Sequence, residues 1–160
     1  LAFGTGAHPT THFWMEWLID NVTKNSQVID YGCGSGILAI AAHKLGAKKI
    51  LGVDIDSQAI TASKENSALN KCSIDWINTD ENFKFQADLI VANILSSALK
   101  ILAPLLASYC KPSGKIALSG ILNSQEDQIK QIYSPWFKFE KTSKNDGWIC
   151  LSGIKNKNDA

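Results

Sequence analysis

The chain has 160 residues, of which 45% are hydrophobic and 19% charged, the proportions of one globular domain with its own core. No apolar run approaches the roughly 20 residues of a membrane-spanning helix, and the first residues have neither the basic start nor the apolar stretch of a signal peptide, so we expect no membrane partner. The net charge is +1 and all 16 basic residues are lysines, which weakens a nucleic-acid or NADP-phosphate interpretation, because bidentate phosphate and guanine recognition favours arginine.

The four cysteines are widely separated, form no CxxC pair and do not cluster with a histidine. This spacing argues against a zinc site and against a disulfide framework, so we expect no metal and reduced thiols in the cytoplasm. The chain lacks an initiator methionine, and we expect it to be part of a longer protein and to be monomeric.

Hydrophobic periodicity predicts helices and strands in alternation along the chain. The predicted helices are residues 11–22, 37–45, 57–69 with Ser57 as N-cap, 96–109 with a kink or break at Pro104, and 125–133. The predicted strands are residues 27–31, 49–54, 73–78, 87–93, 115–121, 137–141 and 148–154.

This alternation indicates an α/β fold, in which βαβ units with right-handed crossovers form a parallel sheet. The turn at residues 145–147 (NDG) predicts a C-terminal hairpin that adds antiparallel strands. We expect one domain over residues 1–154 and a polar tail over residues 155–160.

A glycine-rich loop, DYGCGSG at residues 30–36, follows the first strand and opens a helix. Glycines there allow a tight turn and a close approach of a ligand to the backbone and the helix N-terminus. A dinucleotide fingerprint would read GxGxxG, but Ile37 stands where its third glycine belongs. The DxGxGxG pattern is instead the one with which methyltransferases hold the aminoacyl end of their cofactor, and it involves Asp30, Gly32 and Gly34.

Two polar residues end neighbouring strands of the predicted sheet. Asp54 ends the second strand, 22 residues after Gly32, where a carboxylate can accept both ribose hydroxyls of NAD or of S-adenosylmethionine. Asn93 ends the buried fourth strand, and we expect it to face the glycine loop across the crevice, although it could instead cap the next helix. Asp56 is expected to be solvated or to cap a helix.

The sequence resembles the catalytic domain of ribosomal protein L11 methyltransferases (the PrmA type). The resemblance rests on residues 1–11 (LAFGTGAHPTT), 30–42 (DYGCGSGILAIAA), 52–56 (GVDID), 91–95 (VANIL) and 118–122 (LSGIL), and it spans essentially the whole chain. The first motif is specific to the family, whereas the glycine loop is common to such methyltransferases.

The resemblance implies a Rossmann-like class I methyltransferase fold with a seven-stranded, mostly parallel sheet, and S-adenosyl-L-methionine as the cofactor. It further implies methylation of lysine ε-amino or N-terminal α-amino groups of ribosomal protein L11, with no direct nucleic-acid partner. An N-terminal substrate-recognition domain of the family is expected to be absent here. The implied cofactor-binding positions are Thr11, Gly32, Asp54 and Asn93.

The segment from Phe3 to Thr11 is expected to fold over the bound cofactor. Phe3 can cover an apolar methylthio group, and His8 could lie near the substrate or simply satisfy a turn before proline. The attacking amine must be neutral, which costs roughly 4–5 kcal/mol for a lysine and about 1 kcal/mol for an α-amine at pH 7. Asn93, the predicted catalytic residue, and nearby carbonyls would orient that amine without a strong base.

Three alternatives remain. The chain could methylate a lysine of another protein, or bind the cofactor as a truncated module without turnover. It could also be an NAD-dependent dehydrogenase, which Ile37 and the lack of a recognisable hydride-transfer centre oppose.

Overall fold

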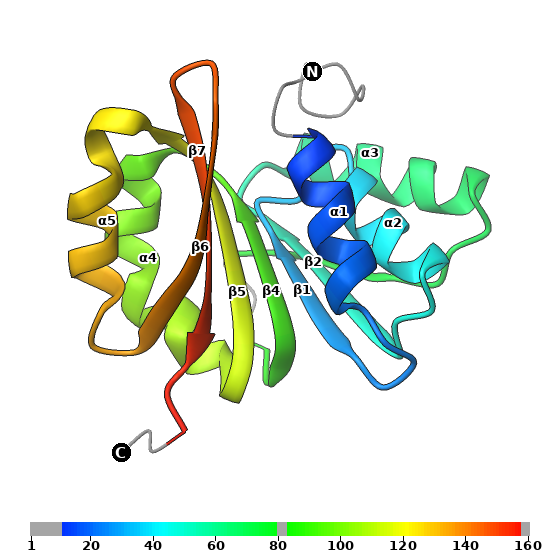
Figure 1. Cartoon of the computed structure of the whole chain (residues 1–160). Helices are drawn as coiled ribbons and strands as arrows, with labels where there is room; N and C mark the ends of the chain where they lie inside the picture. Colours follow the sequence, from blue (N-terminus) through cyan, green and yellow to red (C-terminus); the bar gives the residue numbers. More distant parts are fainter. Residues whose placement is uncertain (1–10, 80–82, 158–160) are drawn as a thin grey trace.

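The structure is a computed structural model of the chain, and it describes residues 11–79 and 83–157. Seven strands form one sheet in the order β3-β2-β1-β4-β5-β7-β6 (Figure 1). The strands are β1 (Gln27–Tyr31), β2 (Lys49–Asp54), β3 (Asp75–Asn78), β4 (Ala87–Asn93), β5 (Cys110–Leu122), β6 (Phe137–Asn145) and β7 (Trp148–Lys155). The helices are α1 (Thr11–Asn21), α2 (Ile37–Lys44), α3 (Ser57–Leu69), α4 (Ser96–Tyr109) and α5 (Glu126–Tyr133), with a 3-10 turn at Asn123–Gln125.

Strands β1 to β5 pair in parallel, and β7 runs antiparallel to both β5 and β6. The β6–β7 connection is a two-residue turn in which Asp146 and Gly147 both have positive φ, as the residues 145–147 signal predicts. The predicted α/β class, the seven-stranded mostly parallel sheet and the antiparallel hairpin are therefore confirmed.

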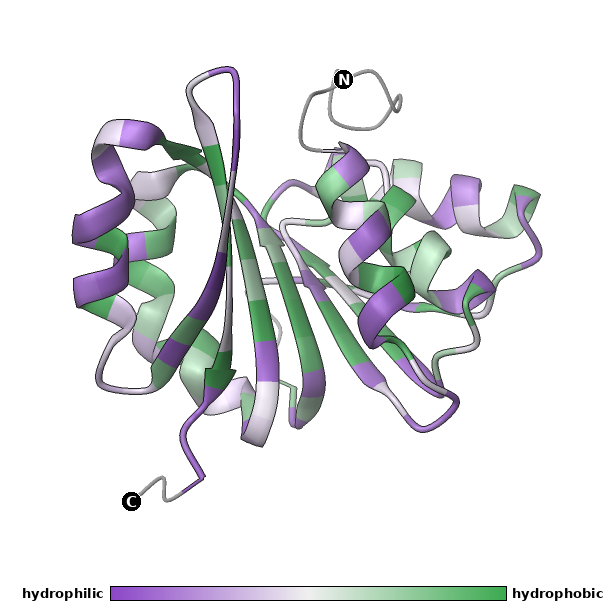
Figure 2. Cartoon of the chain, in the orientation of Figure 1, coloured by the Kyte–Doolittle hydropathy of each residue, from purple (hydrophilic) through white to green (hydrophobic). Residues whose placement is uncertain are grey.

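The sheet separates two hydrophobic layers, because successive side chains of a strand point to opposite faces. Helices α1 and α2 pack their buried residues on one face of the sheet, and α3 lies alongside them (Figure 1). Helices α4 and α5 pack on the other face. Figure 2 shows hydrophobic residues concentrated along the central strands and hydrophilic ones on the outer side of α5. None of the helices in the described part of the chain is long and apolar enough to cross a membrane.

Two helix details differ from the sequence prediction. The N-cap of α3 is Asp56 and not Ser57, which confirms the helix-capping role that was one expectation for Asp56: its carboxylate accepts the Gln58 backbone N–H at 2.9 Å. Helix α4 continues through Pro104 without the break that was one expectation. Proline removes one backbone donor from the helix. The helix nevertheless continues because its apolar face is buried on both sides of Pro104, through Leu99 and Leu106.

The polar tail was predicted to begin at Lys155, but the structure places Lys155 in the sheet. It is the last residue of β7 and is only 2% exposed. Its ammonium donates to the carbonyl oxygens of Ala107 at 2.8 Å and Cys110 at 3.0 Å. These carbonyls lie at the C-terminus of α4, where the helix dipole favours a cation. Lys155 is therefore part of the folded domain.

Candidate functional site

The glycine loop makes the turn from β1 into α2 at the carboxyl ends of the parallel strands. The backbone N–H groups of Gly32 and Cys33 both donate to the carbonyl oxygen of Val53, at 2.7 and 3.0 Å, which ties the loop to β2. Gly32, Gly34 and Gly36 all have positive φ. The loop is thus held in a fixed curve beside the end of β2.

Gly32 and Gly34 meet different surroundings. A Cβ at Gly32 would overlap the side chain of Ile94, so glycine is required there by packing as well as by φ. A Cβ at Gly34 would meet no described atom within 4 Å, and Gly34 lines the main cavity. The backbone at Gly34 is therefore open to a ligand.

Asp30 reaches from β1 to the start of α2. Gly36, the N-cap of α2, has no side chain to cap with, and the Asp30 Oδ2 instead accepts the Ala39 backbone N–H at 3.1 Å. The residue is 1% exposed, and its Oδ1 is buried without a hydrogen-bond partner among the described residues. Burial raises the pKa of the Asp30 carboxyl to about 7; the Ala39 hydrogen bond lowers it and the charge of Asp54 raises it further. A buried polar atom without a partner is costly, so we expect this oxygen to accept a hydrogen bond from a group other than the described residues.

Asp54 ends β2 and connects it to the loop. Its Oδ2 accepts the Gly34 N–H at 3.0 Å, and its Oδ1 accepts the Asp56 N–H at 2.9 Å. Each carboxylate oxygen keeps a further lone pair. The next residue, Ile55, is 80% exposed, so its apolar side chain is accessible to solvent directly after Asp54 in the sequence.

Asn93 ends β4 next to Ser119 of β5, with which it is in register. The Ser119 hydroxyl donates to the Asn93 Oδ1, and the Trp14 indole Nε1–H donates to the Ser119 oxygen at 3.2 Å. Sequence reasoning missed Trp14 and Ser119. A signal for Trp14 exists, because it follows Thr11 by three residues and so shares its helix face.

The main cavity, of about 620 Å³, lies where these elements meet. It brings together Thr11, Asp30, Gly32, Gly34 and Asn93 of the predicted set, while Asp54 lies at its edge through the bond to Gly34. Its full described lining is Thr11, Trp14, Asp30, Gly32, Cys33, Gly34, Ser35, Ile37, Leu38, Asp56, Gln58, Ala59, Ala62 and Asn93. This described lining holds two carboxylates and no basic side chain. Phe3 and His8 lie outside the described residues.

The loop cysteine is not set up as a nucleophile. Cys33 is buried, and this burial above all raises the pKa of its thiol to about 12, although a hydrogen bond with the Ser63 hydroxyl opposes the rise. A protonated thiol is a poor nucleophile. The four cysteines form no disulfide, and the part of the chain that the structure describes has no group of His, Cys, Asp and Glu that could hold a metal ion.

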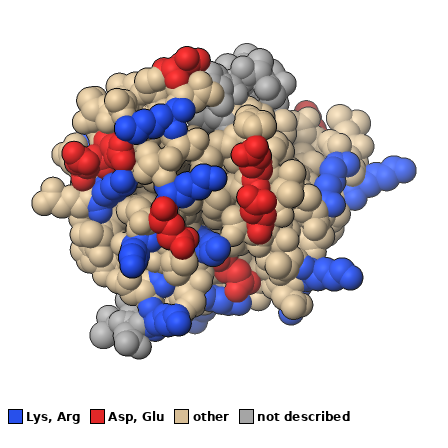
Figure 3. Space-filling model, in the orientation of Figure 1, with Lys and Arg blue, Asp and Glu red and all other residues tan. Residues whose placement is uncertain are grey.

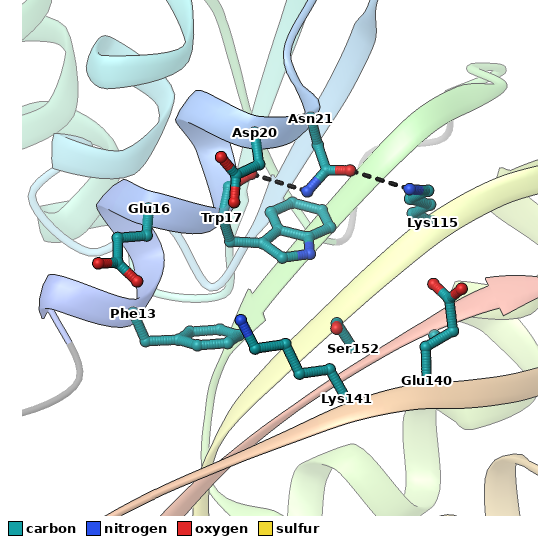
Figure 4. A pocket seen from close by; sticks show the side chains of 10 residues that line it. Phe13, Glu16, Trp17, Asp20, Asn21, Lys115, Glu140, Lys141 and Ser152 are labelled. Atoms are coloured by element: carbon teal, nitrogen blue, oxygen red, sulfur yellow. Dashed lines mark hydrogen bonds between the residues drawn. The ribbon is translucent and has the colours of Figure 1, made fainter.

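A second, smaller hollow of about 250 Å³ lies between α1 and strands β5, β7 and β6 (Figure 4). We call it the α1 groove, and its lining is Phe13, Glu16, Trp17, Asp20, Asn21, Lys115, Glu140, Lys141, Ser152 and Gly153. Asn21 accepts from the Lys115 ammonium at 3.1 Å and donates to the Trp17 carbonyl at 2.8 Å. On the face of the molecule in Figure 3, lysines and acidic side chains lie side by side. None of the predicted site residues that the structure describes lines this groove.

Comparisons with known proteins identify the family of the chain. The family model "Ribosomal protein L11 methyltransferase (PrmA)" matches residues 1–156. The chain is 49% identical over 157 residues to a ribosomal protein L11 methyltransferase of Paraburkholderia phytofirmans, and 52% identical over 155 residues to one of Methylobacillus flagellatus. These matches cover 98% and 97% of the chain but 52% of each relative, so the chain spans about half the length of these proteins.

Solved structures give the same result. A ribosomal protein L11 methylase from Lactobacillus delbrueckii subsp. bulgaricus superposes with a TM-score of 0.85 at 37% identity, covering 94% of this chain and 80% of that one. An RNA methyltransferase from Salinibacter ruber, solved with S-adenosyl-L-homocysteine, shares the fold at 15% identity, with a TM-score of 0.72 over 91% of this chain and 92% of that one. The predicted resemblance is confirmed, and the chain belongs to the ribosomal protein L11 methyltransferase (PrmA) family.

Proposed function

We propose that this chain is the catalytic domain of an S-adenosylmethionine-dependent methyltransferase that methylates amino groups of ribosomal protein L11. The relatives at 49% and 52% identity carry that name, which supports both the reaction and the substrate. When bound, the cofactor supplies a methyl group on a positively charged sulfur. The chain's own residues must hold the two reactants in line and exclude water.

The unpartnered Asp30 Oδ1 in the wall of the cavity is the observation that carries the proposal. A buried carboxylate oxygen next to an open glycine backbone suits the α-ammonium of the cofactor's aminoacyl end. The Asp54 carboxylate at the end of β2 suits the ribose hydroxyls, with one lone pair left on each oxygen. Thr11, Gly32 and Gly34, which line the cavity, are proposed to contact the cofactor as well, and Phe3 is proposed to cover the methylthio group.

The same charges argue against a dinucleotide. The pyrophosphate of NAD would lie beside the glycine loop, where the described lining presents Asp30 and Asp56 and no lysine. Two carboxylates without a basic partner repel phosphate and favour a cation. A sulfonium cofactor with an ammonium group fits this lining, whereas a pyrophosphate does not.

The acceptor amine would approach Asn93 at the end of β4. A neutral amine donates its N–H groups to carbonyl oxygens and directs its lone pair to the methyl group, so Asn93 acts on it by orientation. No strong base is needed for an α-amine, whose deprotonation at pH 7 costs only about 1 kcal/mol, against roughly 4–5 kcal/mol for a lysine.

Calorimetry on the 160-residue chain tests the cofactor. S-adenosylhomocysteine should bind and NAD should not, and Asp54→Ala should weaken binding at least about tenfold through the lost hydrogen bonds to a charged group. Asp127→Ala, which removes an exposed carboxylate from α5, is the matched control and should bind like the parent chain. Binding of NAD in preference would overturn the proposal.

Transfer of a labelled methyl group tests the substrate. The chain should label ribosomal protein L11 and leave an unrelated lysine-rich protein unlabelled. Labelling of both would favour a methyltransferase with another protein as target. Cofactor binding without labelling of either would make this chain a binding module.

A further inference from the structure

The side chains of Asn93 and Ser119 meet because of strand register. In β4 the residues Leu89 and Val91 face the α1 layer, so Asn93, two residues on, faces it as well. In β5 the same alternation turns Ala117 and Ser119 to this layer. Because Asn93 and Ser119 are Cα partners in the parallel β4–β5 pair, their side chains are neighbours on one face of the sheet.

Helix α1 adds Trp14 to the pair formed by Asn93 and Ser119. It lies over this face and buries Trp14, Trp17 and Leu18 against it. The Trp14 indole N–H reaches the Ser119 hydroxyl at 3.2 Å. Trp14 is 1% exposed and Ser119 is fully buried, so neither group can exchange its partner for water.

The chemistry of these groups gives the hydrogen bonds one direction. An indole N–H is only a donor, so the Ser119 oxygen must accept from Trp14. The Ser119 hydroxyl proton then has Asn93 Oδ1 as its acceptor. The opposite amide orientation would present an N–H to Ser119 and leave the buried hydroxyl proton without that acceptor.

We propose that Trp14 and Ser119 are positioning residues for methyl transfer: their hydrogen-bond relay fixes the Asn93 amide with Oδ1 as the acceptor for the substrate amine. The proposal rests on the proposed function. A carbonyl oxygen has two lone pairs, and Ser119 uses one. The second can accept an amine N–H, and the donation from Ser119 polarises the carbonyl and strengthens that bond.

The test uses two cofactor analogues that differ at the reacting position. S-adenosylhomocysteine carries a bare thioether sulfur there, whereas sinefungin carries an amine on the carbon that replaces the sulfur, so only sinefungin offers N–H groups toward Asn93. The affinities of both analogues are measured by calorimetry for the 160-residue chain, and the sinefungin preference is the ratio of the two.

Ser119→Ala should reduce the sinefungin preference about fivefold, the effect of one lost hydrogen bond, with little change for S-adenosylhomocysteine. Asn93→Ala should reduce it at least as much, and the double variant should show no further loss, because both changes remove one unit. Trp14→Phe, which keeps the buried ring, should give a smaller loss. Ser152→Ala is the matched control, since Ser152 is a buried serine of β7 that is the register partner of Ala117.

In turnover Ser119→Ala should lower kcat more than Trp14→Phe does, and both should leave KM for the cofactor nearly unchanged. Equal weakening of both analogues by Ser119→Ala, or additive losses in the double variant, would overturn the relay and leave the proposed function standing. Failure of the parent chain to bind S-adenosylhomocysteine would overturn both. Thermal melts of every variant identify losses that come from unfolding.

Discussion

The main cavity and the α1 groove are both hollows on the α1 side of the sheet, but their polar groups are arranged differently. The lining of the α1 groove contains both carboxylates and lysines (Figure 4). In it, Asn21 accepts a hydrogen bond from the Lys115 ammonium and donates one to the Trp17 carbonyl. The main cavity presents carboxylates without a basic side chain in its described lining, and one carboxylate oxygen has no partner. The two hollows therefore differ in whether their buried polar groups find partners within the described residues, and this difference supports the main cavity as the proposed ligand site.

The glycine loop should show the largest effect of any single change. Gly32→Ala places a methyl group on the Ile94 side chain at φ 78°. The left-handed backbone costs about 1–2 kcal/mol and the overlap about 1–3 kcal/mol more. We expect a loss of about 3 kcal/mol in the free energy of unfolding by urea denaturation, and loss of cofactor binding.

Gly34→Ala is the comparison for that change. Gly34 also has a positive φ, but its Cβ meets no described atom within 4 Å, so the stability loss should be only about 1–2 kcal/mol. Binding of S-adenosylhomocysteine should still fall steeply, since the methyl group enters ligand space. Equal stability losses in the two variants would contradict the packing role of Gly32.

Lys155 offers a second contrast with Asp30, because it is a buried basic residue whose hydrogen-bond partners lie within the chain. Lys155→Met removes the donor to the Ala107 and Cys110 carbonyls. The loss in unfolding free energy should be about 2 kcal/mol, because two buried acceptors lose a charged donor. Calorimetry should find cofactor affinity unchanged, and a loss of affinity in the folded variant would contradict the separation of the two roles.

Asp30 should make stability and binding respond to pH in opposite directions. Its folded pKa is about 7, above the ordinary 3.8, so the stability it contributes is full below pH 3.8 and is lost as the pH rises through 7. Cofactor affinity should instead rise between pH 6 and pH 7.5, since the ionised carboxylate is the form that pairs with an ammonium.

Asp30→Asn checks both directions in melting and calorimetry. Its melting temperature should change less with pH than that of the parent chain, while its affinity for S-adenosylhomocysteine at pH 7.5 should fall about tenfold. Affinity in this variant should no longer rise with pH. A rise equal to that of the parent would assign the titration to another group.

The α1 groove should give the smallest effect. Lys115→Gln removes a charge that is bound to Asn21 on a partly exposed face, and such pairs contribute about 0–1 kcal/mol. Cofactor affinity should stay at the parent value. A clear loss would show that this groove is coupled to the main cavity and would break the comparison.

Most of the fold could be predicted from the sequence because its signals are local. Strand β2 and strand β4 match their predicted bounds, since each is a short apolar run that ends in a polar residue. The hairpin could be read from residues 145–147, because that turn type demands positive φ at two adjacent residues. Strand β5 begins at Cys110, five residues before its predicted start, because pairing with β4 extends it beyond its apolar run.

The candidate site was predictable to the same degree. Asp30, Gly32, Gly34, Asp54 and Asn93 stand at strand ends, where an α/β sheet gathers its ligand-binding residues, and the structure does bring them together. Their roles toward the cofactor stay proposals. The sequence by itself thus determined the layered sheet, the glycine turn and the polar residues at its edge, through periodicity and turn chemistry.

Which distant groups bind each other depends on how the elements pack in three dimensions. Trp14 and Ser119 are 105 residues apart, and Lys155 lies 48 residues from the Ala107 carbonyl it binds. The unpartnered oxygen of Asp30 likewise appears only when α2 and β1 have closed around it. Composition and spacing carry no signal for such contacts, because they depend on strand order, on register and on the placement of a helix over the sheet.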